Sequence, residues 1–245
     1  MSRLQAAALA ALPEVRPGDD LPALLIDAGA GALGPGDVLV VAHKVVSKAE
    51  GAVVDLAQVI PSERALALAA EHDRDPRHTQ VVLDQSAELV RAARGVLICR
   101  THHGFVCANA GVDASNAGAS GRVVTLPRDP DASARRLRAG LPGRPAVVIS
   151  DSFGRAWRNG QVDIAIGVAG LGPLEDWRGR ADADGRELHA TWIAVADEAA
   201  AAADLVRGKD SRIPAVAVHG LERHVTADDG PGAAALVRPR AEDLF

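Results

Sequence analysis

The sequence predicts a mixed α/β (α+β) fold, with helices that flank sheets whose strands run in both directions. Short apolar runs rich in β-branched residues alternate with segments that repeat apolar residues at helical spacing, which indicates strands and helices in turn. Hydrophobic residues make up 48% of the chain and charged residues 24%, the balance of a globular protein rather than a disordered one. The 245 residues fit a single domain over 1–245, with room for two subdomains.

The first part of the chain is expected to hold helices around one buried strand. Residues 18–30 predict a helix because several leucines share one face behind aspartates that can cap its start. The run at 38–42 is continuously apolar and β-branched, which indicates a strand buried on both faces. Further helices are expected at 62–72, where Ser62 can cap the first turn, and at 79–93.

The rest of the chain alternates short strands with helices. Strands at 96–100 and 104–108 are expected to form a hairpin around two histidines and a glycine. The tail from Thr226 onward is polar, and we expect it to be mobile. The other predicted elements are strands at 122–126, 145–150, 164–168 and 213–218, an extended stretch at 188–195, and helices at 131–139 and 196–206.

Composition and charge exclude several classes of function. Lys and Arg total 27 against 32 Asp and Glu, and the net charge of −5 disfavours general nucleic-acid binding. Three Phe, three Trp and no Tyr also disfavour a base-stacking surface. Two cysteines, Cys99 and Cys107, are too few for a disulfide framework or a thiolate zinc site, so we expect a reducing, cytoplasmic setting. No apolar stretch reaches the roughly 20 residues of a membrane span, so no membrane association is expected.

Two glycine-containing segments resemble phosphate-binding loops but fulfil neither pattern. Residues 29–34 have the spacing G-x-G-x-x-G, but a helix precedes them and a strand follows, the reverse of a dinucleotide-binding motif, so we predict a turn. Residues 208–211 match only the tail of a P-loop. Lys44 and Lys48 follow the strand at 38–42, where they could either converge on an anion or form a solvated edge.

Acidic residues at two distant positions suggest a metal site. Asp113 lies in a loop dense in small residues and oxygen donors, while Asp151 and Ser152 follow the strand at 145–150. Carboxylates beside a hydroxyl suit a hard cation such as Mg²⁺ or Mn²⁺. Asp113 and Asp151 are therefore predicted to be two arms of one metal site, although either residue alone would more often cap a helix or a turn.

Two arginines follow the predicted metal site directly. Arg155 and Arg158 carry guanidinium groups that bind carboxylates and phosphates in a bidentate manner, which suggests a polyanionic substrate. Trp157 stands between them, and we expect it to pack locally rather than to stack on a ligand.

Several strings of the sequence occur in the same order in the coenzyme F420-0:L-glutamate ligases, which the chain resembles from about Leu12 to Val218. The strings are LPEV at 12–15, GDDL at 18–21, GDVLVV at 36–41, VSKAEG at 46–51, AGVDASN at 110–116, SDSFGR at 150–155 and GRAWRNGQ at 154–161. The last of these is especially similar to the ligase domain of actinobacterial enzymes. Each string is short, but their joint order and spacing are specific.

The resemblance implies a GTP-dependent ligase that adds L-glutamate to the deazaflavin coenzyme F420-0 through γ-glutamyl amide bonds. It also implies Mg²⁺ or Mn²⁺, with K⁺ as a further candidate, and an intertwined homodimer whose active site lies near the subunit interface. Asp113, Asp151 and Ser152 resemble metal ligands, and the candidate catalytic residues are Asp113, Asp151, Arg155 and Arg158. Residues that resemble GTP contacts are Leu12, Pro13, Glu14, Val15, His43, Lys44, Lys48, Asn116, Arg207, Gly208, Lys209, Asp210 and Ser211.

The chain departs from the family pattern at several places. His43 and Lys44 stand where archaeal members have a pair of small hydroxyl residues, and Ser152 stands where threonine is usual. Lys209 replaces a carboxylate that binds a second metal in archaeal members, and a charged lysine cannot be a metal ligand, which puts that second site in doubt. The sequence also ends without the nitroreductase-like domain of the fused actinobacterial form, so no reduction chemistry is expected.

The expected reaction passes the γ-phosphoryl group of GTP to the terminal carboxylate of the acceptor. The amine of glutamate then displaces phosphate from the acyl phosphate. Arg155 and Arg158 are expected to hold the carboxylate or phosphodiester of the acceptor, and no residue stands out as a general base. Two alternatives remain open: a metal-dependent GTP phosphohydrolase, and a module that binds a deazaflavin or a nucleotide without turnover. The number of glutamates added is not predicted.

Overall fold

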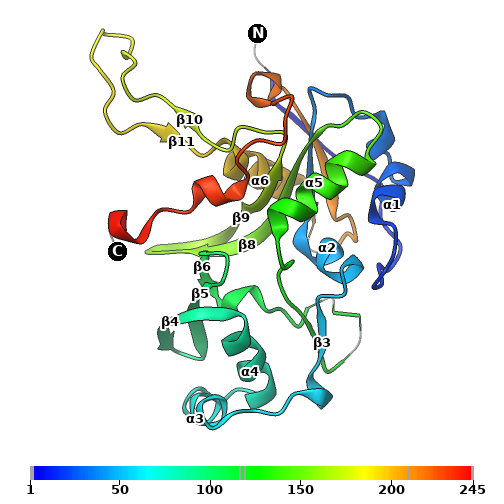
Figure 1. Ribbon diagram of the computed structural model, residues 1–245, viewed down its shortest axis with the longest axis vertical. Helices are drawn as coiled ribbons and strands as arrows, with labels where there is room; N and C mark the ends of the chain where they lie inside the picture. Colours follow the sequence, from blue (N-terminus) through cyan, green and yellow to red (C-terminus); the bar gives the residue numbers. More distant parts are fainter. Residues whose placement is uncertain (1–2, 116, 119, 209, 244–245) are drawn as a thin grey trace.

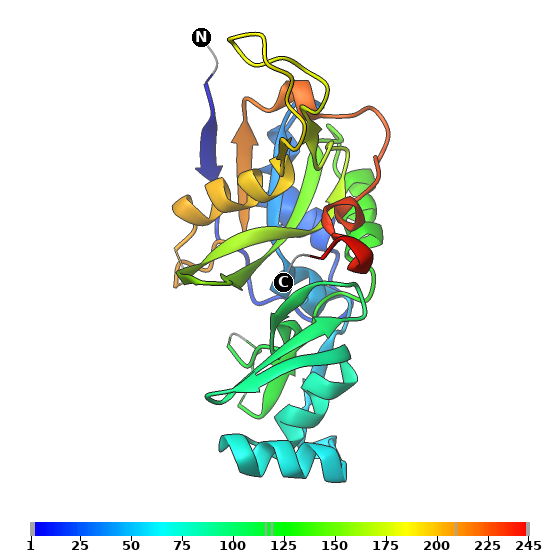
Figure 2. The ribbon, with the colours of Figure 1, turned by 90° about the vertical axis from the view of Figure 1, so that its left-hand side faces the viewer.

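The fold has a larger lobe around a central sheet and a smaller lobe beneath it (Figures 1 and 2). The chain enters the smaller lobe after α2 (His43–Ala49) and leaves it before α5 (Pro130–Gly140). Parallel and antiparallel strand pairs coexist with helices, so the predicted mixed α/β class is confirmed. The computed structural model describes residues 3–115, 117–118, 120–208 and 210–243.

The central sheet has the strand order β1-β12-β2-β8-β9. Neighbouring strands pair antiparallel except for β2 and β8, which run parallel with Ala42 opposite Ser150. The chain therefore leaves β2 at the level of Ser150, and whatever follows Ala42 lies beside Asp151. The strands are β1 (Gln5–Ala8), β2 (Val38–Ala42), β8 (Ala146–Arg155), β9 (Arg158–Ala169) and β12 (Ala215–His219).

Both faces of the central sheet are buried, which explains why β2 is apolar without alternation. Leu39 points into one core, which α1 (Leu21–Asp27) and α5 cover, while Val38 points into a second core beneath α6 (Val195–Val206). Figure 1 shows α5 and α6 on either side of this sheet. Successive residues of a strand face opposite sides, so β8 also presents two chemically distinct faces.

The smaller lobe has a core of its own, built from side chains of its strands and helices. One sheet has the order β4-β5-β6, and β3 pairs with β7 in a second, two-stranded sheet. This lobe carries the loop with Asp113, whose backbone bridges to Val124. Its elements are β3 (Val53–Asp55), α3 (Glu63–His72), α4 (Pro76–Asp84), β4 (Ser86–Ala93), β5 (Val96–Thr101), β6 (Val106–Ala108) and β7 (Arg122–Val124).

The remaining elements are short. β10 and β11 form the base of an arm that projects from the larger lobe in Figure 1. None of the helices in the described part of the chain has both the length and the apolar composition needed to cross a membrane. These elements are β10 (Glu175–Asp176), β11 (Trp192–Ile193) and single-turn helices at Ala30–Ala32, Leu56–Gln58, Asn109–Gly111, Glu222–His224, Ala233–Leu236 and Arg240–Glu242.

The predicted helix at 79–93 was wrong in its second half. The helix is α4, which begins after the capping residue Asp75 and ends at Asp84, and the chain then continues as β4. Strand β4 pairs with β5 through two register irregularities, so its apolar residues do not follow strict alternation. That irregular spacing explains why this segment resembled a helix.

Three further segments differ from the prediction. A helix, α2, follows β2 directly, and the strand expected at 145–150 continues to Arg155, so Asp151 lies within β8 rather than at its end. The tail beyond Thr226 packs against the larger lobe: buried Arg138 pairs with Asp229, and Asp131 accepts hydrogen bonds from the backbone of Ala233 and Ala234. The glycine-rich segment at 29–34 is a turn, as predicted.

The two cysteines lie opposite each other on β5 and β6, and both are buried. Burial raises the pKa of Cys99 and raises that of Cys107 to about 12. Because the thiolate is the reactive form, we expect neither thiol to react with Ellman's reagent at pH 8 until the protein unfolds. The same sample in concentrated guanidinium chloride supplies the control, in which both thiols should react at once. Rapid reaction of either thiol in the native protein would contradict this prediction.

Candidate active site

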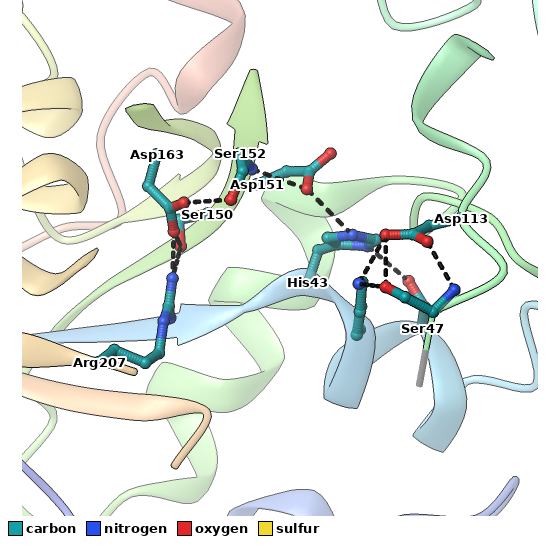
Figure 3. Close-up of polar contacts among 10 residues, drawn as sticks. His43, Ser47, Asp113, Ser150, Asp151, Ser152, Asp163 and Arg207 are labelled. Carbon is teal, nitrogen blue, oxygen red and sulfur yellow. Dashed lines mark hydrogen bonds and ion pairs between the residues drawn. The ribbon is translucent and has the colours of Figure 1, made fainter. Parts of the chain in front are cut away.

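The site begins where β2 ends, at the first turn of α2. His43 is 2% exposed, and its Nδ1 lies 3.4 Å from the Ser47 hydroxyl, one helical turn further on. Its Nε2 lies 3.3 Å from Oδ1 of Asp151 on β8, without the alignment of a hydrogen bond. Figure 3 shows the imidazole extending toward this carboxylate. The parallel pairing of β2 and β8 thus brings a buried imidazole against a half-buried carboxylate.

Asp113 reaches the same turn of α2 from the smaller lobe. Its Oδ2 lies 2.6 Å from Nζ of Lys44 and accepts a hydrogen bond from the Ser115 hydroxyl at 2.9 Å. Its Oδ1 accepts a hydrogen bond from the Ser115 backbone N–H at 2.6 Å. Burial by itself would raise the pKa of Asp113, but the hydrogen bonds from Lys44 and Ser115 outweigh it and lower the pKa below its ordinary value. The group is a carboxylate at neutral pH.

The structure therefore places both predicted metal carboxylates against the first turn of α2. Consecutive residues of α2 hold them, because His43 contacts Asp151 and Lys44 contacts Asp113. Figure 3 shows Asp113 and Asp151 on either side of the His43 ring. Among the described residues, no group of three or more His, Cys, Asp and Glu side chains is arranged to hold a metal ion. A cation here would depend on the two carboxylates and on ligands from the substrate or solvent.

Ser152 lies on the opposite face of β8 from Asp151. Its hydroxyl donates a hydrogen bond to Asp163 at 2.6 Å rather than facing Asp113, and Ser150 donates to the same carboxylate at 2.8 Å. The structure does not bring the side chain of Ser152 together with the two predicted metal carboxylates. Asp163 is a polar residue that the sequence did not indicate, because only the register of β8 against β9 shows that it faces Ser152.

Arg207 belongs to this opposite face as well. Its guanidinium forms an ion pair with Asp163 and donates a hydrogen bond to the Ser150 hydroxyl at 3.1 Å. In Figure 3 this cluster stands on one side of β8, while His43 and Asp113 stand on the other. The side chain of Arg207 therefore connects the end of α6 to β8 and β9 and does not extend toward Lys44.

The predicted nucleotide-binding segments lie next to one another. Leu12 and Val15 are buried in the core, while the carboxylate of Glu14 lies 2.6 Å from Nζ of Lys48 on α2. The backbone N–H of Leu12 donates to the carbonyl of Arg212 at 3.3 Å, which joins the segment at 12–15 to the loop that follows α6. The chain folds so that the segments at 12–15, 43–48 and 207–213 are neighbours.

Ser211 forms two hydrogen bonds within the loop after α6. The Ser211 hydroxyl donates to the carbonyl of Gly208 at 2.8 Å and accepts from the N–H of Ile213 at 3.2 Å. Gly208 and Asp210 are exposed, as is Pro13 in the adjoining segment. Asn116 and Lys209, both predicted to contact the nucleotide, lie outside the described residues.

Arg155 and Arg158 lie at the far end of the β8–β9 hairpin. Arg155 donates to the carbonyl of Asn159 at 2.6 Å, and the two arginines are opposite each other in the strand register. Arg155 lies four residues beyond Asp151 along β8, or about 13 Å away. The structure does not bring these arginines to Lys44 and Asp113. Trp157 at the turn is 81% exposed.

A cavity of about 310 Å³ lies beside the β8–β9 hairpin and is lined by residues of both lobes and of the C-terminal tail. Phe153, two residues beyond Asp151, lines it together with Phe105 of the smaller lobe, and their rings meet edge to face at 6.3 Å. Arg100 and Arg238 line the cavity together with Asp197 and Asp243, and Arg100 pairs with Asp243 at 3.6 Å. The cavity therefore combines apolar side chains with charged groups of both signs.

Replacing Lys44 by methionine is expected to raise the pKa of Asp113, because burial then acts without the strongest compensating hydrogen bond. In the wild type, the lowered pKa stabilises the fold above the unfolded value of about 3.9, and this stabilisation is lost as the pH falls through the folded value. The variant should lose it already at higher pH. Urea unfolding at pH 6 and pH 4 measures the difference, with Lys48→Met, whose amine pairs with Glu14, as the matched control. Equal pH dependence in both variants would contradict the role of Lys44.

Comparison with known proteins places most of the chain within one group. Residues 10–220 match the protein family described as F420-0:gamma-glutamyl ligase. A protein of Methanothermobacter thermautotrophicus, named coenzyme F420:L-glutamate ligase, is 44% identical over 242 residues, which cover 96% of this chain and 95% of that protein. Proteins of the same name from Methanopyrus kandleri and Methanocaldococcus jannaschii are 44% and 43% identical over 238 and 215 residues, covering 95% and 86% of this chain and 93% and 84% of theirs.

Proposed function

Because the chain belongs to the F420-0:gamma-glutamyl ligase family, we propose that it is a ligase that joins L-glutamate to coenzyme F420-0 at the expense of GTP. The observation that carries the proposal is the convergence of Asp113 and Asp151 on the first turn of α2, one from each lobe. Relatives that share 44% of their residues over nearly the whole chain carry the name of this reaction. The bond formed is an amide between a carboxylate of the acceptor and the amine of glutamate.

The nucleotide is proposed to bind along the segments at 12–15, 43–48 and 207–213. Contacts between Glu14 and Lys48, and between Leu12 and Arg212, make these segments neighbours. Lys44 and Lys48 lie on α2 one helical turn apart, so their ammonium groups can offset the negative charge of a triphosphate. Both amines pair with carboxylates here, which implies that the phosphates compete with Asp113 and Glu14 for them.

The donor set at this place fits Mg²⁺ or Mn²⁺. Magnesium commonly binds through one or two carboxylates together with substrate phosphates and water, and Asp113 and Asp151 provide two carboxylates. Among the described residues, Lys44 and Ser115 form hydrogen bonds with the carboxylate of Asp113, so a cation would have to share this carboxylate with them. When bound, the cation would neutralise charge on the phosphoryl group in transfer.

The proposed reaction has two steps. The carboxylate of F420-0 attacks the γ-phosphorus of GTP, GDP leaves, and an acyl phosphate forms. The amine of glutamate then attacks the acyl carbon, phosphate leaves, and the amide remains after the amine loses a proton. Lys44 and Lys48 are proposed to stabilise the charge that spreads over the phosphoryl oxygens in the first step.

The acceptor is proposed to enter from the cavity beside Phe153. Phe153 in the wall of this cavity lies two residues from Asp151 on β8, and the cavity combines aromatic rings with Arg100 and Arg238 beside Asp197 and Asp243, which supports the entry of a deazaflavin that carries a phosphodiester. Arg155 and Arg158, further along β8, remain candidates for a more distant anionic group of the acceptor. The predicted homodimer stays a prediction, which sedimentation velocity tests directly.

The deciding experiment incubates the protein with GTP, Mn²⁺, L-glutamate and F420-0 and separates the products by chromatography with mass detection. We expect a product heavier by one glutamyl residue, together with GDP and phosphate in equal amounts. Absence of this product from intact protein would reject the proposal. Release of phosphate without glutamate would favour a GTP phosphohydrolase, and stoichiometric binding without phosphate release would favour a binding module. The same assay, followed over time, counts the glutamates added.

A further inference from the structure

Asp163 stands at the centre of a buried polar cluster behind the candidate active site. It lies on β9 opposite Ser152, and the residue is 1% exposed. Its carboxylate accepts hydrogen bonds from the hydroxyls of Ser150 and Ser152, at 2.8 Å and 2.6 Å, and forms an ion pair with Arg207. Three donors from two separate parts of the chain therefore meet on one carboxylate (Figure 3).

A buried ion pair of this kind contributes little to stability by itself. Removing a carboxylate and a guanidinium from water costs about as much free energy as their attraction returns, and apolar residues of similar volume often replace such pairs without loss. What the pair does supply is a fixed geometry, because every donor must stay in place once the charge is buried. This geometry fixes two features of the candidate site.

The first feature is the orientation of the Asp151 side chain. This residue stands between Ser150 and Ser152, and side chains alternate along a strand, so its carboxylate points to the face opposite Asp163, toward His43. The strand register shifts between Ile149 and Ser150, so ordinary pairing with β9 is interrupted just before Asp151. Hydrogen bonds from both neighbouring hydroxyls to one buried carboxylate hold the strand at this irregular point.

The second feature is the position of the loop that follows α6. Arg207 is the capping residue at the end of that helix, and its other terminal nitrogen donates to the carbonyl of Pro214 at 3.3 Å. The guanidinium thus spans the loop 208–213 from one end to the other. Within the loop, the carbonyl of Arg212 accepts the hydrogen bond from Leu12. Any shift of Arg207 would therefore move the segments proposed to hold GTP.

We propose that Asp163 and Arg207 are positioning residues for the ligase reaction, holding Asp151 and the nucleotide-binding loops in register from the far face of the sheet. This inference rests on the proposed function. Both side chains lie on the face of β8 opposite the carboxylate of Asp151, and their role is to keep this carboxylate and the loops at the strand ends at a fixed mutual distance. Small displacements matter here, since misplacement by about 1 Å can cost about a hundredfold in rate.

The test uses Asp163→Asn, Arg207→Met and the double variant. Each single variant breaks the buried ion pair, so both should unfold at lower temperature, and the double variant, with neither of these two charges, should recover much of that loss. A purely structural role predicts that activity per folded molecule recovers as well. Positioning predicts that the double variant still has kcat about tenfold to a hundredfold below the wild type and a raised KM for GTP, with KM for glutamate unchanged.

A control is the ion pair between buried Arg138 and partly exposed Asp229, which ties the C-terminal tail to α5. Arg138→Met with Asp229→Asn should change thermal stability, while kcat and KM for GTP stay at wild-type values. Wild-type kinetics in the folded Asp163→Asn, Arg207→Met protein would overturn the inference, as would equal kinetic losses in the control. If the wild type itself forms no glutamylated product, the proposed function fails, and the inference fails with it.

Discussion

Replacing Asp151 by asparagine is expected to slow glutamate ligation by about a hundredfold to a thousandfold while the fold stays intact. The substitution keeps the size of the side chain and removes the charge that faces His43 at 3.3 Å. A neutral amide is a poor ligand for a hard cation, and it gives no electrostatic support to the transferring phosphoryl group. Initial rates at saturating GTP, glutamate and F420-0 measure the loss, and circular dichroism checks the fold.

The matched control for this variant is Asp184→Asn, an identical change at an exposed position of the arm between β10 and β11. Its rate should equal that of the wild type. A rate near the wild-type value for Asp151→Asn, in a protein with unchanged circular dichroism, would remove this carboxylate from the mechanism. It would also leave Asp113 without a partner for a cation.

Gly167→Ala is expected to destabilise the protein by about 3 kcal/mol or more, the largest effect on stability that we predict for a single methyl group. Gly167 lies on β9 where α5 begins, and an added Cβ would lie 2.6 Å from the carbonyl carbon of Pro130. Backbone atoms cannot swing aside as a flexible side chain would, so the sheet and α5 must separate. With a shift of about 2–4 °C per kcal/mol for a chain of this size, the midpoint of thermal unfolding should fall by about 6–12 °C.

The control is Gly154→Ala in the same hairpin. A Cβ there would meet no atom within 4 Å, and the backbone of this glycine has no positive φ. Its stability should stay within about 0.5 kcal/mol of the wild type. Urea unfolding of the three proteins compares them directly, and equal midpoints for Gly167→Ala and Gly154→Ala would refute the packing argument.

Much of the larger lobe could be predicted because its elements have one dominant signal. Strand β2 is apolar at every position since both of its faces are covered, and α6 is an unbroken run of helix-forming residues after Val195. The smaller lobe was harder to predict. Strand β4 pairs irregularly with β5, and its apolar residues imitate the spacing of a helix, so the local pattern does not determine its structure.

The candidate site also contains residues that could be predicted from the sequence and residues that could not. Carboxylates at 113 and 151 were predicted to meet from their residue types and from the resemblance, and the structure places both against α2. The predicted grouping of Ser152 with them ignored the alternation of a strand that continues past residue 150. Asp163 could not be found at all, because its partners depend on a strand register that no local pattern reveals.

The replacement at residue 43 has a structural consequence of its own. His43 fills a position where the resemblance implies a small hydroxyl residue, and its ring is almost fully buried between Ser47 and Asp151. An imidazole occupies more volume than a hydroxyl group and offers two ring nitrogens. The imidazole therefore occupies space beside Asp151 that a small hydroxyl residue would leave open.

The smaller lobe has a hydrophobic core of its own, while its Phe105 and Cys107 also belong to the core of the larger lobe. Asp113 comes from the smaller lobe and Asp151 from the larger one, so rotation of one lobe against the other would change the separation of the two carboxylates and disturb the contact between Phe105 and Phe153. A ligand that binds both carboxylates would connect the two lobes and restrict this rotation. A ligand present at about a hundred times its dissociation constant would stabilise the bound arrangement of the two lobes by about 2.7 kcal/mol. The thermal unfolding of the two lobes should therefore become more tightly coupled when the ligand is bound.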